Sequence, residues 1–154
     1  MSRRLKWSLI AATAAVIIIA VIAGFIFVGE DNATARVYTE NDYNRDVNAI
    51  MASLLPELEA EVDAFKVVDP TIGQELAELS VLKMLGKYQT ANIELQAIQA
   101  PNGKTSDHEK LTEIIRTGET ECGELAKEYE SGNYEADPEP CLNAFEELKR
   151  FNKK

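Results

Sequence analysis

The sequence TENDYNRDVNAIMASLLPELEAEVDAFKV, residues 39–67, contains the pattern that indicates the fold. Its apolar side chains recur at steps of three and four residues, which places them on one face of an α-helix. They are Tyr43, Val47, Ile50, Leu54, Leu58, Val62 and Phe65. Pro56 removes one backbone hydrogen bond, but the apolar face keeps its phase on both sides of the proline. We therefore expect one kinked helix rather than two separate helices.

Three more amphipathic segments follow, at about residues 71–100, 106–131 and 138–152. The predicted buried face of the first segment consists of Ile72, Leu76, Leu79, Leu82, Leu85, Ile93 and Ala97. That of the second consists of Leu111, Ile114, Ile115, Gly118, Cys122, Leu125 and Tyr129. That of the third consists of Cys141, Leu142, Phe145, Leu148 and Phe151. No stretch of the sequence alternates apolar and polar residues as a strand does. Four helices with short connections predict an all-α fold, an antiparallel bundle of about four helices.

Capping patterns mark the expected helix starts. Asp69-Pro70 has the order of an N-cap and a first-turn proline. Thr71, three residues before Gln74, forms a competing capping box at the same helix. The pair Ser106–Glu109 predicts a capping box for the following helix.

Upstream of the bundle, residues 8–28 (SLIAATAAVIIIAVIAGFIFV) form an uncharged run of 21 residues. A helix of this length spans about 31 Å, close to the thickness of the hydrocarbon core of a bilayer. Arg3, Arg4 and Lys6 precede the run, and basic flanks stay on the cytoplasmic side. We expect a transmembrane signal-anchor helix with its N-terminus in the cytoplasm.

This topology divides the chain into four parts. Residues 1–7 form a short cytoplasmic tail, residues 8–28 cross the lipid bilayer, residues 29–38 are a connector and residues 39–154 are the extracytoplasmic bundle. The alternative is a signal peptide cleaved after Ala35, which ends an A-x-A pattern. The protein would then be secreted. Both interpretations place the bundle outside the cytoplasm.

The charge of the chain limits its partners. All 26 acidic residues and 13 of the 16 basic residues follow the apolar run, so this part carries a formal net charge of −13. Nucleic acids and anionic lipid headgroups are bound by clustered Lys and Arg, so we expect neither as a partner. A basic protein surface or a cation remains compatible with this charge.

The chain contains two cysteines, Cys122 and Cys141. In an oxidising compartment two cysteines predict one disulfide, and the alternative is two buried free thiols. The sequence has no CxxC motif, and its single histidine, His108, has too few companions for a zinc site. We expect no metal and no cofactor.

Carboxylates are concentrated between Glu119 and Glu147, where ten acidic residues accompany one base, Lys127. The candidate surface for a protein partner consists of Glu124, Glu128, Tyr134, Glu135 and Asp137. One alternative is a solvated acidic face with Tyr134 folded back onto the bundle. Another is a calcium site, although the sequence lacks a D-x-[DN]-x-[DN]-G loop.

No motif in the sequence indicates an enzyme, since Walker, GxSxG, GxGxxG and HExxH patterns are missing. His108 is expected to face solvent in the first turn of a helix, and we assign no catalytic residue. The predicted function is a non-catalytic, membrane-anchored interaction module that binds another envelope or membrane protein through its acidic face. The alternatives are a small-ligand or cation-binding envelope protein, and a hydrolase whose site the sequence does not reveal.

Overall fold

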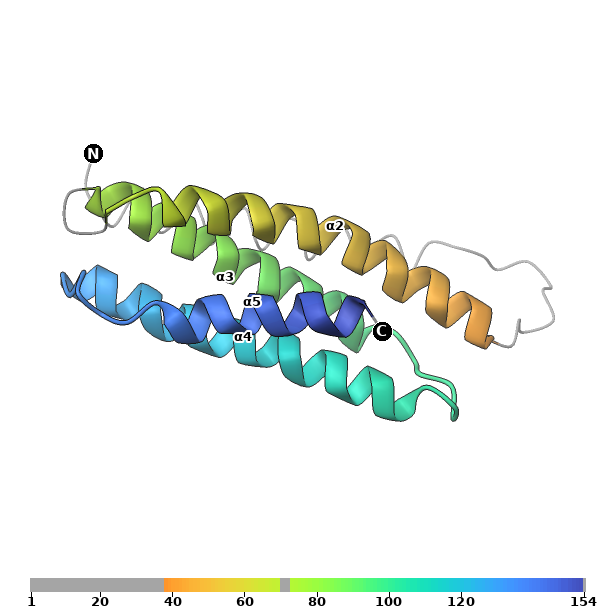
Figure 1. The fold of residues 1–154 in the computed structure, drawn as a ribbon. Coiled ribbons are helices and arrows are strands. Elements are labelled where there is room, and N and C mark those ends of the chain that lie inside the picture. The colour runs from red at the N-terminus through yellow and green to blue at the C-terminus, as the bar shows by residue number, and fades with distance from the viewer. Residues whose placement is uncertain (1–37, 70–72, 154) are drawn as a thin grey trace, which may run out of the picture. The chain divides into compact units, whose positions relative to one another are not determined.

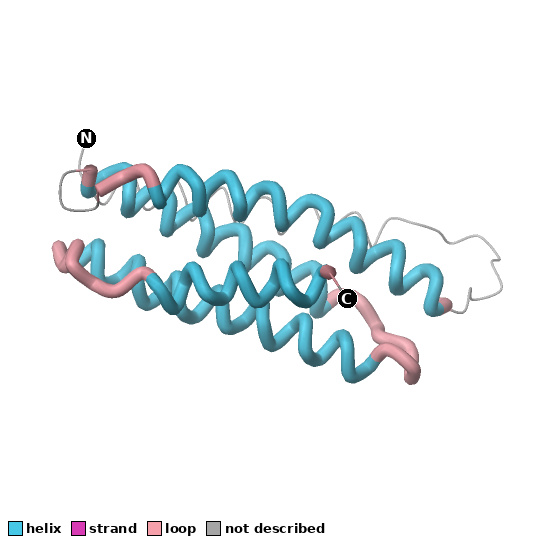
Figure 2. The backbone as a smooth tube through the Cα atoms, in the orientation of Figure 1, coloured by secondary structure: helices cyan, strands magenta, loops and turns pink. Residues whose placement is uncertain are grey.

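Four α-helices make up most of the described chain, in the order shown in Figure 1. The computed structural model describes residues 38–69 and 73–153. The helices are α2 (Glu40–Lys66), α3 (Gln74–Gln96), α4 (Thr105–Ser131) and α5 (Glu139–Asn152). The described residues contain no β-strand (Figure 2). The prediction of an all-α fold is confirmed.

The four helices pack in a ring. α2 packs on α3, α3 on α4, α4 on α5, and α5 returns to α2. Each helix runs antiparallel to the one before it (Figure 1). The segment Val37–Lys154 forms a compact unit by itself. This arrangement is the predicted antiparallel bundle.

The predicted membrane helix at residues 8–28 and the cleavage pattern at Ala35 lie outside the described residues. None of the described helices, α2 to α5, has the combination of length and hydropathy that a membrane span requires.

α2 follows its prediction closely. The Thr39 hydroxyl accepts a hydrogen bond from the Asp42 backbone N–H, and the Asp42 carboxylate accepts one from the Thr39 backbone N–H. This capping box satisfies two N–H groups at the helix start. The helix then continues through Pro56 to Lys66. Its core face buries Tyr43, Met51, Leu54, Leu58, Val62 and Phe65, with Val47 and Ile50 half-buried.

α3 turns a different face to the core from the predicted one. Its buried residues are Ala77, Ser80, Val81, Met84, Tyr88, Ala91 and Leu95. On the predicted face, Leu76, Leu79 and Ile93 remain 59%, 47% and 46% exposed. The prediction for this face was wrong, because α3 carries apolar residues on two sides. The side that packs combines large residues, Met84, Tyr88 and Leu95, with the small residues Ala77, Ser80 and Ala91.

The starts of α3 and α4 also differ from the prediction. The N-cap of α3 is Gly73, so the helix begins at Gln74, later than either predicted cap, and no side chain caps it. The N-cap of α4 is Lys104, and the helix begins at Thr105 without a side-chain cap. The predicted Ser106–Glu109 capping box was therefore wrong.

α4 buries the face that its sequence predicts, including Leu111, Ile115, Cys122, Leu125 and Tyr129. Gly118 lies against α3, where a Cβ atom would overlap the ring of Tyr88. The missing side chain lets the two helices approach closely. Gly86 of α3 is different, because a Cβ atom there would meet nothing within 4 Å.

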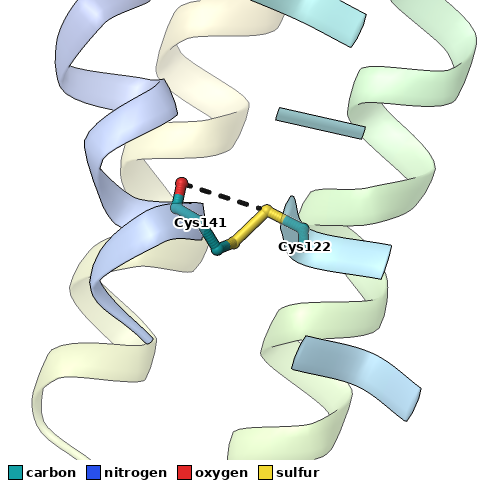
Figure 3. The surroundings of a disulfide bond; sticks show 2 residues. All are labelled: Cys122 and Cys141. Atoms are coloured by element: carbon teal, nitrogen blue, oxygen red, sulfur yellow. Dashed lines mark hydrogen bonds between the residues drawn. A yellow bond between two sulfur atoms is a disulfide. The ribbon is translucent and has the colours of Figure 1, made fainter. Parts of the chain in front are cut away.

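Cys122 and Cys141 form the predicted disulfide (Figure 3). Their Cα atoms lie 4.7 Å apart, and both residues are buried. The bond fastens the first turn of α5 to the C-terminal half of α4. The dashed line in Figure 3 joins Cys122 Sγ to the Cys141 carbonyl oxygen at 4.0 Å. A disulfide sulfur has no proton to donate, so this is a packing contact.

Candidate interaction surfaces

The predicted acidic residues lie on the C-terminal half of α4 and on the loop that follows it. Glu124, Glu128, Glu135 and Asp137 are all exposed. Glu124 and Glu128 stand one helical turn apart, so they share a face of α4. We name these four carboxylates the acidic surface.

Hydrogen bonds hold two members of the acidic surface in place. Asn133 Nδ2 donates to Glu128 Oε2 at 2.8 Å, across the end of α4. The backbone N–H of Glu139 donates to Asp137 Oδ1 at 2.9 Å, so Asp137 helps to satisfy the first turn of α5.

The acidic surface lacks the ion pairs that the acids of α2 form. Four glutamates of α2 form ion pairs with lysines from elsewhere in the bundle. The pairs are Lys83 with Glu61, Lys87 with Glu57, Lys104 with Glu40, and Lys149 with Glu59. The hydrogen bond from Lys87 holds the pKa of the Glu57 carboxyl below its usual range. Within residues 38–69 and 73–153, no lysine or arginine pairs with the acidic surface. The described residues therefore supply no ion pair to its carboxylates.

Tyr134 folds back against the bundle instead of projecting from the loop. Its ring centroid lies 5.2 Å from that of Tyr129, and its hydroxyl donates to Glu78 Oε2 at 3.4 Å. The residue is half-buried. Of the five predicted surface residues, Tyr134 is thus the one that contributes mainly to packing.

No group of three or more His, Cys, Asp or Glu side chains in the described part of the chain is arranged to hold a metal ion. The carboxylates of the acidic surface are spread along a helix and a loop. They present negative charge over a broad face without converging on one point.

His108 is half-buried beside Tyr43, although the sequence predicted that it would face solvent. The Tyr43 hydroxyl oxygen lies 3.4 Å from His108 Nδ1, and the two rings meet edge to face with centroids 5.7 Å apart. Burial raises the pKa of the Tyr43 hydroxyl, and the nearby Asp107 carboxylate adds to this effect. The contact joins residues 65 positions apart, so no local pattern in the sequence indicates it.

A shallow cleft of about 350 Å³ opens next to this pair. It exists because α5 has 14 residues and α4 has 27, so α5 ends before it covers the whole groove between α2 and α4. Val47 and Met51 of α2, Leu111 of α4 and Phe151 of α5 supply its apolar lining. The unequal helix lengths were visible in the sequence, but the cleft was not predicted from them.

Comparison with protein-family models, with curated proteins and with solved structures finds no match for this chain.

Proposed function

We propose that this protein is a non-catalytic, membrane-tethered interaction module whose bundle lies outside the cytoplasm and binds a basic surface on another envelope or membrane protein. One observation carries the proposal. The exposed carboxylates of Glu124, Glu128, Glu135 and Asp137 have no cationic partner among the described residues, while four glutamates of α2 are paired with lysines.

The negative charge of the acidic surface indicates which kind of partner it would bind. Uncompensated like charges repel each other, so a surface with complementary positive charge relieves that repulsion on binding. Such complementarity mainly raises the association rate and makes binding sensitive to salt. The bundle would thus recognise a protein that presents clustered Lys and Arg.

The proposed location is supported by two features. The uncharged run at residues 8–28, with Arg3, Arg4 and Lys6 before it, has the length and flanks of a signal anchor. Disulfides form and persist in oxidising compartments, so the Cys122–Cys141 bond supports a bundle outside the cytoplasm. Cleavage after Ala35 is the alternative, and it would release the same bundle in the same compartment.

A second candidate function is the binding of a small ligand, and the cleft beside Tyr43 favours it. The volume of about 350 Å³ lies within the range of small-molecule sites. The cleft is open to solvent, however, and such sites usually enclose most of their ligand. We rank this function below protein binding for that reason.

A capture experiment with matched charge variants tests the proposal. The full chain, purified in detergent, is compared with the variant Glu124→Gln, Glu128→Gln, Glu135→Gln, Asp137→Asn. The control variant Asp63→Asn, Glu94→Gln, Glu109→Gln, Glu113→Gln removes the same charge from exposed positions elsewhere. Asparagine at position 137 keeps a side-chain acceptor for α5.

We expect the unmodified chain and the control to capture the same envelope protein at low salt. The acidic-surface variant should bind that protein at least about tenfold more weakly, and added salt should weaken binding by the unmodified chain. Equal capture by both variants would show that the acidic surface is not the binding site. A thermal shift with a small-molecule panel or calcium, without any protein partner, would favour the second function.

A further inference from the structure

The outer face of α3 carries the largest group of exposed apolar side chains on the described helices. Leu76, Leu79 and Ile93 lie there, and the remaining strongly exposed large apolar residue, Val67, follows the end of α2. Leu76 and Leu79 are close together, and Ile93 lies fourteen residues further along the helix. Exposed apolar surface that is more than a scatter of single residues commonly marks a site of protein contact. We therefore consider the side of α3 opposite its core face as a candidate contact surface for a partner.

The spacing along this face is that of a coiled-coil seam. Leu79, Gly86 and Ile93 are seven residues apart, the spacing of heptad position a. Leu82, Gln89 and Gln96 occupy the d positions between them. None of these six residues is charged, and each is exposed or half-buried. We name them the α3 seam.

Gly86 at the centre of the α3 seam leaves room for another helix. A Cβ atom there would meet nothing within 4 Å, so no part of the described chain fills the space beside it. Glycine lets a second backbone approach closely, as in many tightly packed helix pairs. The unfilled space beside Gly86 lies midway along the helix between the exposed side chains of Leu79 and Ile93.

The charges beside the α3 seam are complementary to a second copy in parallel orientation. Glu78 occupies position g and Lys83 the following position e, five residues later. In a parallel pair, position g of one helix faces the next position e of the other. Glu78 of each copy would then face Lys83 of its partner, twice in the dimer. Within each copy Lys83 pairs with Glu61 at 3.2 Å and Glu78 accepts a hydrogen bond from Tyr134, and both groups keep further hydrogen-bonding capacity for a partner copy.

The net charge of the chain also favours the α3 seam as the surface through which two copies make contact. The part of the chain after the apolar run carries −13, so two copies repel each other where their acids face. The α3 seam is uncharged, and contact through it leaves the acidic surface on α4 free.

We propose that a second copy of this chain docks along the α3 seam in parallel orientation, forming a two-fold symmetric dimer. Gly86, Gln89 and Gln96 bury little apolar surface, so the association is weak in dilute solution. Confinement to a membrane would raise the effective concentration and favour the dimer. The dimer does not depend on whether the acidic surface binds a partner.

Disulfide cross-linking of the full chain in lipid vesicles tests the seam and its direction. Leu79→Cys and Ile93→Cys place a free thiol at position a, and Ala60→Cys places one on an exposed site of α2 as a control. Mild oxidation should link the first two variants into dimers and leave the control monomeric. Equal cross-linking of all three variants, or of none, would overturn the proposal. In an antiparallel pair, position 79 of one copy would lie near position 93 of the other. Cross-links that form only when Leu79→Cys chains are mixed with Ile93→Cys chains would therefore overturn the parallel arrangement.

Charge exchange supplies a second test that does not add cysteines. Glu78→Lys and Lys83→Glu should each raise the dissociation constant about fivefold in sedimentation equilibrium. The double variant should return to within about twofold of the unmodified chain, because the pairs are restored in reverse. Three variants with equal dissociation constants would contradict the Glu78–Lys83 pairing. The acidic-surface variant should dimerise normally, which separates this proposal from the proposed function.

Discussion

Tyr88 of α3 lies directly against Gly118 of α4, so that a Cβ atom on Gly118 would overlap the tyrosine ring. The contact lies inside the bundle, where Tyr88 is fully buried. It sets how closely the two helices approach. Substitution at this point should therefore report on the packing of α3 against α4.

Gly118→Ala should lower the free energy of unfolding by about 1–2 kcal/mol, because overpacking outweighs the gain in helix propensity. Gly123→Ala is the matched control on the same helix. Its Cβ atom would lie 3.6 Å from Leu85 Cδ1, an ordinary contact. This variant should gain about 0.5–1 kcal/mol. Urea denaturation followed by circular dichroism measures both, and a stabilised Gly118→Ala variant would contradict the close contact.

Substitutions of Leu95 and Ile93 test which face of α3 is buried, because they should affect stability differently. Leu95 is fully buried and Ile93 is 46% exposed, although the residues are neighbours on one helix. Leu95→Asp should cost more than about 4 kcal/mol, because it buries an unpaired charge. Ile93→Asp should change the stability of the monomer by less than about 0.5 kcal/mol. If thermal melts showed the reverse order, the core face of α3 would be the one first predicted from the sequence.

The disulfide should contribute substantially to stability. Replacing both Cys122 and Cys141 by alanine should lower the free energy of unfolding by about 3 kcal/mol, since the closed loop spans 19 residues. Reductant should destabilise the unmodified chain by a similar amount and leave the variant unchanged. Alkylation of the native, unreduced protein followed by mass spectrometry should find no modified cysteine; two modified cysteines would rule out the bond.

The buried hydroxyl of Tyr88 predicts a loss of stability at alkaline pH. Its oxygen has no hydrogen-bond partner in the described part of the chain, and burial raises the pKa of Tyr88 above its usual value. In the unfolded chain tyrosine ionises near pH 10, while in the bundle it stays neutral. Stability is therefore intact below about pH 10 and falls as the pH rises above it.

Tyr88→Phe should reduce this pH dependence. The variant loses a group that favours the unfolded chain at high pH, so its decline between about pH 9 and pH 11 should be shallower. At neutral pH it should be as stable as the unmodified chain or up to about 1 kcal/mol more stable, because an unpaired buried hydroxyl is removed. Urea titrations across this pH range measure the difference, and identical slopes would contradict the assigned burial.

The sequence predicted α2 and α4 well because each has a single apolar face. The apolar residues from Leu54 to Phe65, and from Leu111 to Tyr129, point to one side of their helices and pack there. α3 has two apolar sides, so hydrophobic periodicity alone did not distinguish the buried side from the exposed one. The buried side contains Ala77, Ser80 and Ala91, whose small size matters only when neighbouring helices are in place.

The candidate surfaces were predictable to different degrees. Exposure of Glu124 and Glu128 follows from the face of α4 that they share, which the sequence defines. The return of Tyr134 onto Tyr129 remained one of two alternatives, because loop conformation depends on the bundle around it. The α3 seam became visible only when the structure showed which side of α3 was covered.

The location of the bundle outside the cytoplasm is the central claim, because the disulfide, the anchor and the proposed partner all depend on it. A protease-cleavable tag placed after Lys154 tests it in intact cells or spheroplasts. We predict that added protease removes the tag while the membrane is intact, and that the chain stays in the membrane fraction. A tag that resists the protease until the membrane is permeabilised would place the bundle in the cytoplasm and contradict the account.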